Sequence, residues 1–423
     1  MSQKMNMPQD ANYELKTIRV KKKEVQYLAN SFERSEASDS LSSTLRLVRN
    51  GKLSMVSSTK PSDEESLIAR AIELAPYGIS YEVPFADDSH VNDLDLYEAS
   101  NLTTQQIIER AGDLVSDLKS LDSRLTINTN LSLTETEVAL ETSLGFNQQY
   151  KQSQWMSMAR VELVQGDDIL SLYKYISDRT SDLDYESIKR GFAYQLSYAK
   201  QVVPFNSGSY PVIFAPMEVN NIIAPITASV NGLAVHRGFS LWKDKLGEQV
   251  LNSQFSLVDD GSIIKRWTSV PFDAEGVPTR NNILIQNGVI QSFLTDRKVA
   301  LALGSESTGN SIGAMLAPYH LMIPAGDQAL NDLIRSIDCG LIIYHTMGSW
   351  SANPYNGVVT GTISMGLKIE KGEIVGRIKD CMFSLNAFQH FKDHFSGASL
   401  EIESARAHDF PYVLLDNVVI TTK

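Results

Sequence analysis

The chain has 423 residues and a net charge of −12, with 43% hydrophobic and 21% charged residues. This length exceeds one compact core and predicts roughly two or three domains. The acidic balance argues against a nucleic-acid surface, which needs clustered basic residues. No run approaches the roughly eighteen apolar residues of a membrane span, and the polar N-terminus lacks a signal peptide's apolar stretch. With only Cys339 and Cys381, both expected to be buried, we predict a cytoplasmic protein in a reducing compartment.

The chain opens with a polar stretch, residues 1–12, which predicts a loose tail. Short alternating runs across residues 13–56 predict strands. The pair Asn50-Gly51 lies between two of these runs, and both residues tolerate positive φ, so a hairpin turn is expected there.

Helical signals follow these strands. A capping box that begins at Ser62 and ends at Glu65 predicts a first helix, which stops near Gly78. Residues 79–100 are rich in aspartate and poor in apolar side chains, and we expect an exposed connection there. Thr103 and Gln106 repeat the capping pattern and predict the start of a second helix.

The pattern then changes from helix to strand. Alternate apolar residues from Leu125 onward predict a half-buried strand, and residues 165–168 predict a turn between two further strands. Residues 184–200 predict a third helix. The short polar stretch 204–210 contains proline and glycine and predicts a linker.

The remaining chain consists mainly of predicted strands and turns. Residues 212–216 predict a buried strand and residues 217–235 a helix. Lys371-Gly372 predicts another hairpin, residues 385–395 a helix, and residues 412–420 a final strand.

These elements predict an α+β fold with two domains. The N-terminal domain, residues 13–203, would pack helices on antiparallel strands. The C-terminal domain, residues 211–423, would be β-rich.

An acidic loop lies in the middle of the C-terminal half. Residues 271–278, PFDAEGVP, place two carboxylates and a glycine between two prolines, which predicts a shaped loop. The pair Asn287-Gly288 then predicts a tight hairpin. The groove edge that this loop would present to a peptide or a partner subunit comprises Pro271, Phe272, Asp273, Glu275, Gly276 and Pro278. Alternatively Asp273 and Glu275 serve as an acid–base pair, or they cap nearby backbone N–H groups while Gly276 takes positive φ.

Two histidines form the strongest metal candidate from spacing alone. His390 and His394 stand four residues apart on a predicted helix, so their imidazoles could share a face and a metal ion. No glutamate lies between them, and a solvated helix face is the alternative interpretation. His408 could add a third ligand only if the fold brings it close.

Most of these motifs also resemble one known family. Residues 259–304 and the STGN of residues 307–310 are similar to the signature region of the TldD/PmbA family. Further similar stretches lie at residues 207–216, 245–250, 142–153 and 48–59. The family is known for peptide maturation and as DNA gyrase modulators, and the resemblance implies an association with metallopeptidase activity.

The resemblance also indicates where zinc would bind. In the TldD-type branch a His-Glu-x-x-x-His helix follows the strand at residues 212–216, and a cysteine near the C-terminus completes the site. The motif should fall near residues 223–228, where the local sequence IIAPIT offers no ligand. His236 is the nearby histidine, and one imidazole cannot replace the three protein ligands of a catalytic zinc. The segment around His408 also lacks the cysteine.

The chain therefore resembles the metal-less PmbA/TldE-type branch. This implies that it binds no cofactor itself, that zinc is expected in a TldD-type partner, and that the substrate is a peptide. The expected assembly is a heterodimer with a TldD-like protein, or a homodimer. Two alternatives stay open: a self-sufficient hydrolase that uses His390 and His394 or Asp273 and Glu275, and a homodimeric peptide-binding module without catalysis.

Overall fold

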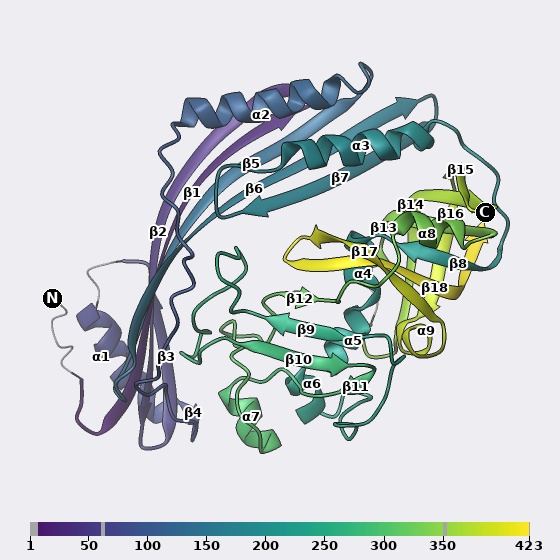
Figure 1. Cartoon of the computed structure of the whole chain (residues 1–423). Helices are drawn as coiled ribbons and strands as arrows, with labels where there is room; N and C mark the ends of the chain where they lie inside the picture. The colour runs from purple at the N-terminus through teal and green to yellow at the C-terminus, as the bar shows by residue number, and fades with distance from the viewer. Residues whose placement is uncertain (1–6, 61–63, 350–352, 423) are drawn as a thin grey trace.

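The computed structural model describes residues 7–60, 64–349 and 353–422. Within these residues the strands form two sheets, one from each half of the chain (Figure 1). Helices pack on the first sheet and surround the second. The predicted α+β class with a β-rich C-terminal half is confirmed.

The first sheet contains strands from the N-terminal part of the chain. They are β1 (Ala11–Leu28), β2 (Ser31–Arg49), β3 (Lys52–Ser58), β4 (Ile79–Ser80), β5 (Thr126–Thr142), β6 (Asn147–Gln165) and β7 (Asp168–Asp178). Their order is β4-β3-β2-β1-β5-β6-β7, and all neighbours are antiparallel. The predicted hairpin at Asn50-Gly51 is confirmed, because both residues have positive φ, 53° and 71°. The predicted turn at residues 165–168 joins β6 to β7.

Residues 13–56 form strands as predicted, and the first two are longer than the short alternating runs that mark them. β1 has 18 residues and β2 has 19, and they pair along their whole length. The first half of β2 is exposed, so no apolar period marks it in the sequence. Its partners are backbone groups and cross-strand side chains such as Arg19 and Asp39, which form two hydrogen bonds of 2.9 and 2.7 Å.

Helices cover the ends of this sheet (Figure 1). They are α1 (Glu64–Leu74) with the short 3-10 turn η1 (Ala75–Tyr77), α2 (Thr104–Lys119) and α3 (Tyr185–Ala199). The first packs on β2 and β3, the second on β1 and β5, and the third on β7.

The helix starts follow their predicted capping residues. The capping box of Thr103 with Gln106 is present at α2 and confirms that prediction. The third predicted helix is also confirmed, with Asp184 accepting a hydrogen bond from the Ser187 N–H at its start. The predicted cap at Ser62 lies outside the described residues.

The connection over residues 79–100 is partly buried, so the prediction of an exposed segment is wrong there. Phe85, Ala86, Leu94 and Leu96 are all at most 4% exposed. The Leu96 carbonyl accepts from Ser153 in the first sheet, and the Leu94 carbonyl accepts from Lys265 in the C-terminal half. The segment therefore crosses the sheet and ties it to the second half of the molecule.

The second sheet contains all strands of the described chain after residue 207. They are β8 (Gly208–Phe214), β9 (Leu257–Asp260), β10 (Asn281–Gln286), β11 (Val289–Ile290), β12 (Leu321–Met322), β13 (Cys339–Met347), β14 (Val358–Glu370), β15 (Glu373–Ile378), β16 (Cys381–Asn386), β17 (Phe395–Ala405) and β18 (His408–Thr422). The order is β11-β10-β9-β12-β18-β16-β14-β13-β8, with β15 on β14 and β17 on β18. Because β8 also pairs with β18, the strands β18, β16, β14, β13 and β8 form a closed ring.

Two predicted hairpins of this half are confirmed. Asn287 and Gly288 have φ of 51° and 78° between β10 and β11, and Lys371 and Gly372 have φ of 53° and 78° between β14 and β15. Both pairs therefore supply the two positive φ values that a tight two-residue turn requires.

The helices of the C-terminal half are short. They are α4 (Pro216–Ile222), α5 (Ala224–Ser229), α6 (Gly232–His236), α7 (Arg297–Leu303), α8 (Leu330–Arg335) and α9 (Ala387–Asp393). The single helix predicted over residues 217–235 is wrong, since this stretch is divided among α4, α5 and α6. Pro225 lacks an N–H and lies in the first turn of α5. Asn231 caps α6 through the Leu233 N–H.

The two halves share a hydrophobic core. Val161 and Phe192 from the first half belong to one buried cluster with Ile213, Ile342 and Leu367 from the second. β8 begins at Gly208, inside the stretch predicted as a linker. Residues 1–6 of the predicted tail lie outside the described residues, and the predicted domain boundaries stay predictions.

The cysteines differ in environment. Cys381 is buried, but Cys339 is exposed, so the prediction that both are buried is wrong for Cys339. It is the first residue of β13 and precedes the buried part of that strand. None of the helices within the described ranges is long and apolar enough to cross a membrane.

Candidate functional site

The acidic loop, residues 271–278, is closed on itself by Asp273. One carboxylate oxygen of Asp273 accepts from the N–H groups of Glu275 and Val277, each at 2.9 Å. The other accepts from the Ser311 N–H at 3.0 Å. Phe272 and Pro278 pair across the base of the loop. These contacts match the capping alternative, in which the carboxylate satisfies backbone donors.

The same loop contacts the first sheet. The Phe272 ring lies 5.3 Å from the ring of Phe146 and 5.2 Å from that of Tyr150, both edge to face. Gly276 has φ of 75°, and an added Cβ there would lie 2.8 Å from the Ala86 side chain and 3.1 Å from that of Leu140. The loop is therefore a joint between the two halves.

Both carboxyl groups of the loop hold protons more tightly than usual. Burial raises the pKa of Asp273 to about 6, against the effect of its backbone donors. Burial also raises the pKa of Glu275 to about 7, and the neighbouring Asp273 and Asp296 act in the same direction. Glu275 accepts from the Arg297 N–H at 2.9 Å, at the start of α7. Asp273 is buried, and both of its oxygens accept hydrogen bonds from backbone N–H groups. These contacts give no added support to a groove edge or to an acid–base pair, and both stay predictions.

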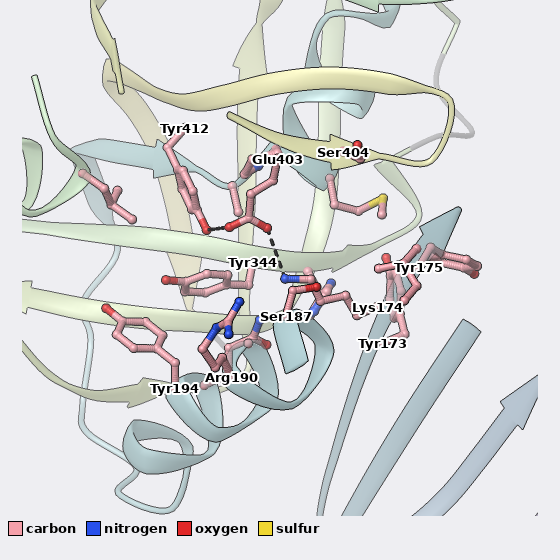
Figure 2. Close-up of a pocket in the computed structure, with 18 residues that line it drawn as sticks. Tyr173, Lys174, Tyr175, Ser187, Arg190, Tyr194, Tyr344, Glu403, Ser404 and Tyr412 are labelled. Carbon is pink, nitrogen blue, oxygen red and sulfur yellow. Dashed lines mark hydrogen bonds and ion pairs between the residues drawn. The ribbon is translucent and has the colours of Figure 1, made fainter. Parts of the chain in front are cut away.

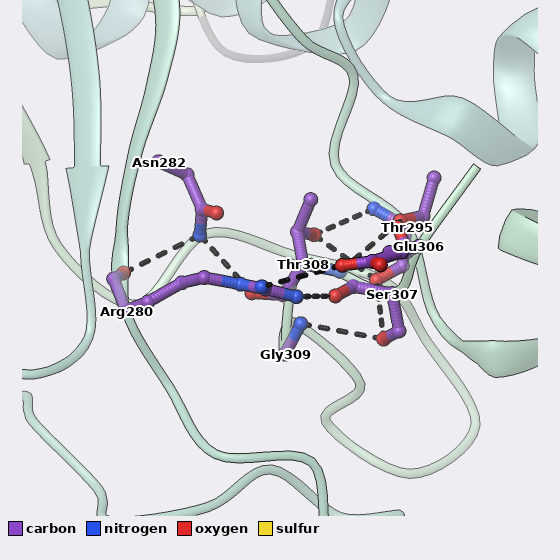
Figure 3. A network of polar contacts seen from close by, with 7 residues as sticks. All are labelled: Arg280, Asn282, Thr295, Glu306, Ser307, Thr308 and Gly309. Carbon is purple, nitrogen blue, oxygen red and sulfur yellow. Dashed lines mark hydrogen bonds and ion pairs between the residues drawn. The ribbon is translucent and has the colours of Figure 1, made fainter.

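Ser307, Thr308 and Gly309 of the STGN stretch belong to a polar network with Arg280, Asn282 and Thr295 (Figure 3). Thr295 and Thr308 bond reciprocally: each N–H donates to the other's hydroxyl, at 2.8 and 3.1 Å. The Arg280 guanidinium donates to the Ser307 carbonyl. Asn282 donates to the Thr308 carbonyl at 3.1 Å.

The network continues into the interior. Asn282 donates to the Asn310 side chain at 3.2 Å, and Asn310 donates to Asp259 at 2.6 Å. Asp259 also accepts from the His320 N–H at 2.8 Å. These polar groups are buried and hydrogen-bonded. They hold residues 307–311 in place, and this segment ends at Ser311, whose N–H donates to Asp273. The residues that carry the family resemblance thus form a scaffold for the acidic loop.

His390 and His394 do not form a solvent-exposed face of α9. His390 is 7% exposed, its Nδ1 contacts the Asn386 carbonyl at 2.9 Å, and its Nε2 contacts the Asn417 carbonyl at 3.3 Å. His394 follows the last residue of α9 and contacts the Asn417 amide at 3.2 Å. The alternative of a solvated face is therefore wrong for His390. No cluster of three or more histidine, cysteine, aspartate or glutamate side chains in the described part of the chain could hold a metal ion.

His408 lies in a different place from the histidine pair. Its Nδ1 accepts from the Leu321 N–H at 3.0 Å, and burial, followed by the nearby His320, lowers its pKa to about 4. The neighbouring Asp409 is paired with Arg266 at 2.6 Å. His408 is thus a neutral, bonded imidazole.

A cavity of about 430 Å³ lies against α5, and we call it the α5 cavity. It includes the segment where the resemblance placed the zinc motif, through Ala224, Pro225, Thr227 and Ala228. Its other described polar neighbours are asparagines, Ser349 and His408. This set provides one imidazole and neither carboxylate nor thiolate, so the residues present do not fit a zinc ion with three protein ligands.

A buried carboxylate that the sequence analysis did not identify lies on α4, which also carries Asn220 and Asn221 of the α5 cavity. Glu218 on α4 is fully buried and accepts from the Thr346 N–H at 2.8 Å and the Thr346 hydroxyl at 2.6 Å. The Asn221 amide donates to it at 3.0 Å. Burial raises the pKa of Glu218. Its bonds fix the end of β13 to α4.

A second cavity, of about 540 Å³, lies where β7 and α3 meet the C-terminal half (Figure 2). We call it the tyrosine cavity, because Tyr173, Tyr175, Tyr194, Tyr344 and Tyr412 line it. The sequence did not predict this cavity, because its walls come from segments far apart in the chain. Tyr173 and Tyr175 lie on β7, whereas Tyr344 and His345 lie on β13.

Comparisons with known proteins agree with the resemblance. Residues 207–422 match the family model described as the PmbA/TldA metallopeptidase C-terminal domain. The chain is similar to the metalloprotease PmbA homolog of Haemophilus influenzae, 28% identical over 331 residues that cover 73% of this chain and 70% of that protein. It is also similar to the metalloprotease TldD homolog of that organism, 34% identical over 148 residues that cover 33% and 30%. The crystal structure of TldE from Thermococcus kodakarensis has the same fold, with a TM-score of 0.89, 21% identity and 97% and 96% coverage.

Proposed function

Because this chain belongs to the PmbA/TldD family, we propose that it is a TldE-type subunit of a zinc metallopeptidase assembly that processes or degrades peptides. In this proposal a TldD-type partner holds the zinc ion and cleaves the peptide. The present chain binds no metal and helps to enclose the substrate.

The lining of the α5 cavity carries this proposal. Where the TldD-type branch has its His-Glu-x-x-x-His helix, this chain has alanine, proline and threonine, and Pro225 lies in the first turn of α5. A catalytic zinc takes about three protein ligands and leaves one position for water. The Nδ1 atom of His408 is not free to bind zinc, because it already accepts a hydrogen bond from the Leu321 N–H.

The names of the relatives support the same assembly. One relative is named a metalloprotease PmbA homolog and another a metalloprotease TldD homolog, and a protein named TldE shares the fold. A chain of this size can provide the roughly 1,200–2,000 Å² that a specific subunit interface buries.

Metal analysis and light scattering test the proposal. The chain would be purified alone, a TldD-type protein alone, and the two together, each followed by gel filtration. We expect well under one zinc per chain alone, a larger particle in the mixture, and cleavage of an unfolded peptide only where the TldD-type protein is present.

Two results would reject the proposal. A tightly bound zinc in the isolated chain that is lost in the His390→Ala, His394→Ala double variant would favour a self-sufficient hydrolase. A clean monomer that neither self-associates nor binds the TldD-type protein would reject the subunit role.

A further inference from the structure

The tyrosine cavity contains a buried histidine that has no hydrogen-bond partner among the described residues. His345 is 4% exposed, and no described residue bonds to either of its ring nitrogens. Burial lowers the pKa of His345 to about 3, with Lys174 acting in the same direction. The imidazole is therefore neutral and offers one N–H donor and one acceptor. Leaving such buried groups unsatisfied destabilises the folded protein.

The strand that carries His345 is distorted at this point. The register of β13 against β14 passes from Ile343 opposite Gly366 to His345 opposite Met365, so Tyr344 is an extra residue. Successive side chains of a regular strand point to opposite faces. Here both Tyr344 and His345 line the cavity. Such bulges often lie next to functional sites, where they change the direction of a side chain.

The opposite wall is the edge of the first sheet. In the described part of the sheet β7 pairs with β6 alone, and residues 173–176 of β7 line the cavity. An edge strand presents unpaired backbone N–H and C=O groups, to which an extended peptide can add as a further strand. The Tyr173 ring lies 4.3 Å from the His345 ring, so this edge and the bulge face the same space.

Two charged residues of the cavity, Lys174 and Glu403, are paired with each other. Lys174 lies 3.3 Å from Glu403, and Glu403 also accepts from the Tyr412 hydroxyl at 2.8 Å (Figure 2). Arg190 is mostly exposed. The buried end of a ligand therefore meets a neutral imidazole and tyrosine rings. This chemistry disfavours a phosphate or a carboxylate at His345 and suits an amide, which has a donor and an acceptor in one plane.

We propose that the tyrosine cavity binds an extended peptide segment, with an amide group of the peptide against His345 and an apolar or aromatic side chain against the tyrosines. The peptide backbone would lie along the edge of β7. The volume of about 540 Å³ falls in the range of roughly 300–1,000 Å³ that is typical of ligand pockets. This inference rests on the proposed function, because it takes the substrate of the assembly to be a peptide. It adds that this chain itself binds part of that peptide.

The isolated full-length chain provides the test. The probe is a capped tetrapeptide, N-acetyl-Ala-Gln-Phe-Ala-amide, added to protein with isotope-labelled histidine and studied by NMR and calorimetry. We expect saturable binding that shifts the His345 ring nitrogens, which are assigned by their disappearance in His345→Phe.

Two variants and a control locate the binding. His345→Phe should weaken binding at least tenfold, about 1.4 kcal/mol. Gly191→Leu leaves the imidazole in place but fills space at the wall, since a Cβ at Gly191 lies 3.0 Å from the end of the flexible Lys174 side chain; it should weaken binding similarly. The exposed His236→Phe, which lies outside the cavity lining, should bind as the unchanged protein does.

Each other outcome overturns the inference. No binding of the tetrapeptide, or binding that neither cavity variant weakens, would remove this site from the chain. Adenosine that binds more tightly than the peptide would make the cavity a nucleobase site. Since neither zinc nor a partner is present, such a failure leaves the subunit proposal standing. A failed zinc or assembly test would reject that proposal whatever the peptide does.

Discussion

The acidic loop and the tyrosine cavity both bury polar side chains at the boundary between the two halves, but they satisfy them differently. In the loop, Asp273 accepts three backbone hydrogen bonds and Glu275 accepts one. In the cavity, both ring nitrogens of His345 are without a partner among the described residues.

This difference distinguishes polar groups that stabilise the fold from polar groups that can bind a ligand. Buried polar groups in folded proteins are nearly always bonded, and an exception needs an explanation. A fully bonded group such as Asp273 contributes to the fold and has little left to offer a ligand. An unbonded group in an open cavity keeps its capacity for one. The sequence drew attention to the acidic loop, whereas the imidazole with two unbonded ring nitrogens lies in the tyrosine cavity.

The largest effect should come from the loop glycine. Gly276→Ala keeps the loop's carboxylates but adds a methyl group at φ of 75°, 2.8 Å from the Ala86 side chain. We expect a loss of roughly 2–4 kcal/mol in the free energy of unfolding, from backbone strain and overpacking together. Chemical denaturation measures it.

Gly166→Ala is the matched control. Gly166 also has positive φ, 62°, but nothing lies within 4 Å of an added Cβ. It should lose only about 1 kcal/mol. Equal losses for the two variants would mean that the loop is not tightly packed on the first sheet. The acidic loop would then not be the structural joint that distinguishes it from the tyrosine cavity.

Local chemistry explains which elements were predictable. Some elements depend only on residues a few positions apart, and these can be predicted from the sequence. They include the hairpins at Asn50-Gly51 and Asn287-Gly288 and the capping box at Thr103. The acidic loop was recognised as shaped for the same reason, because its proline and glycine residues act locally.

Long-range packing explains what was missed. The exposed half of β2 has no apolar period, since no core covers it. The tyrosine cavity brings Lys174 to Glu403 across 229 positions of sequence, and no spacing rule joins such residues. The bulge that turns His345 into the cavity depends on the register between β13 and β14, which the sequence alone does not reveal.

A smaller effect, dependent on pH, should come from Glu275. Its pKa is about 7 in the folded protein and about 4.5 in the unfolded chain. Between these values the unfolded state loses its proton first, so this group lowers stability as pH rises from about 4.5 to about 7. The glutamine of Glu275→Gln cannot ionise, and its oxygen can still accept from the Arg297 N–H. We expect this substitution to stabilise the protein by roughly 1–3 kcal/mol at pH 8 and to change little at pH 4.5.

Denaturation at several pH values checks this expectation. Glu306→Gln is the control, because the Glu306 side chain is 93% exposed and should change stability little at any pH. If the Glu275→Gln variant is less stable at pH 8 than at pH 4.5, relative to the unchanged protein, the fold stabilises the Glu275 charge and the expectation is wrong.

The smallest effect compares two buried histidines directly. His390 and His345 are 7% and 4% exposed, but His390 contacts the carbonyl groups of Asn386 and Asn417, whereas His345 has no partner among the described residues. Phenylalanine has a similar shape and removes both nitrogens. His390→Phe should lose about 1 kcal/mol, because it removes a hydrogen bond of a buried side chain.

The corresponding change at the cavity should have the opposite sign. His345→Phe removes polar atoms that have no partner in the described part of the chain, so the free energy of unfolding should stay the same or rise by up to about 1 kcal/mol. Denaturation of both variants without added peptide measures the difference. If His345→Phe is as unstable as His390→Phe, the imidazole is already bonded within the folded chain. His345 would then belong with Asp273 as a structural group, and the contrast between the loop and the cavity would fail at its most direct test.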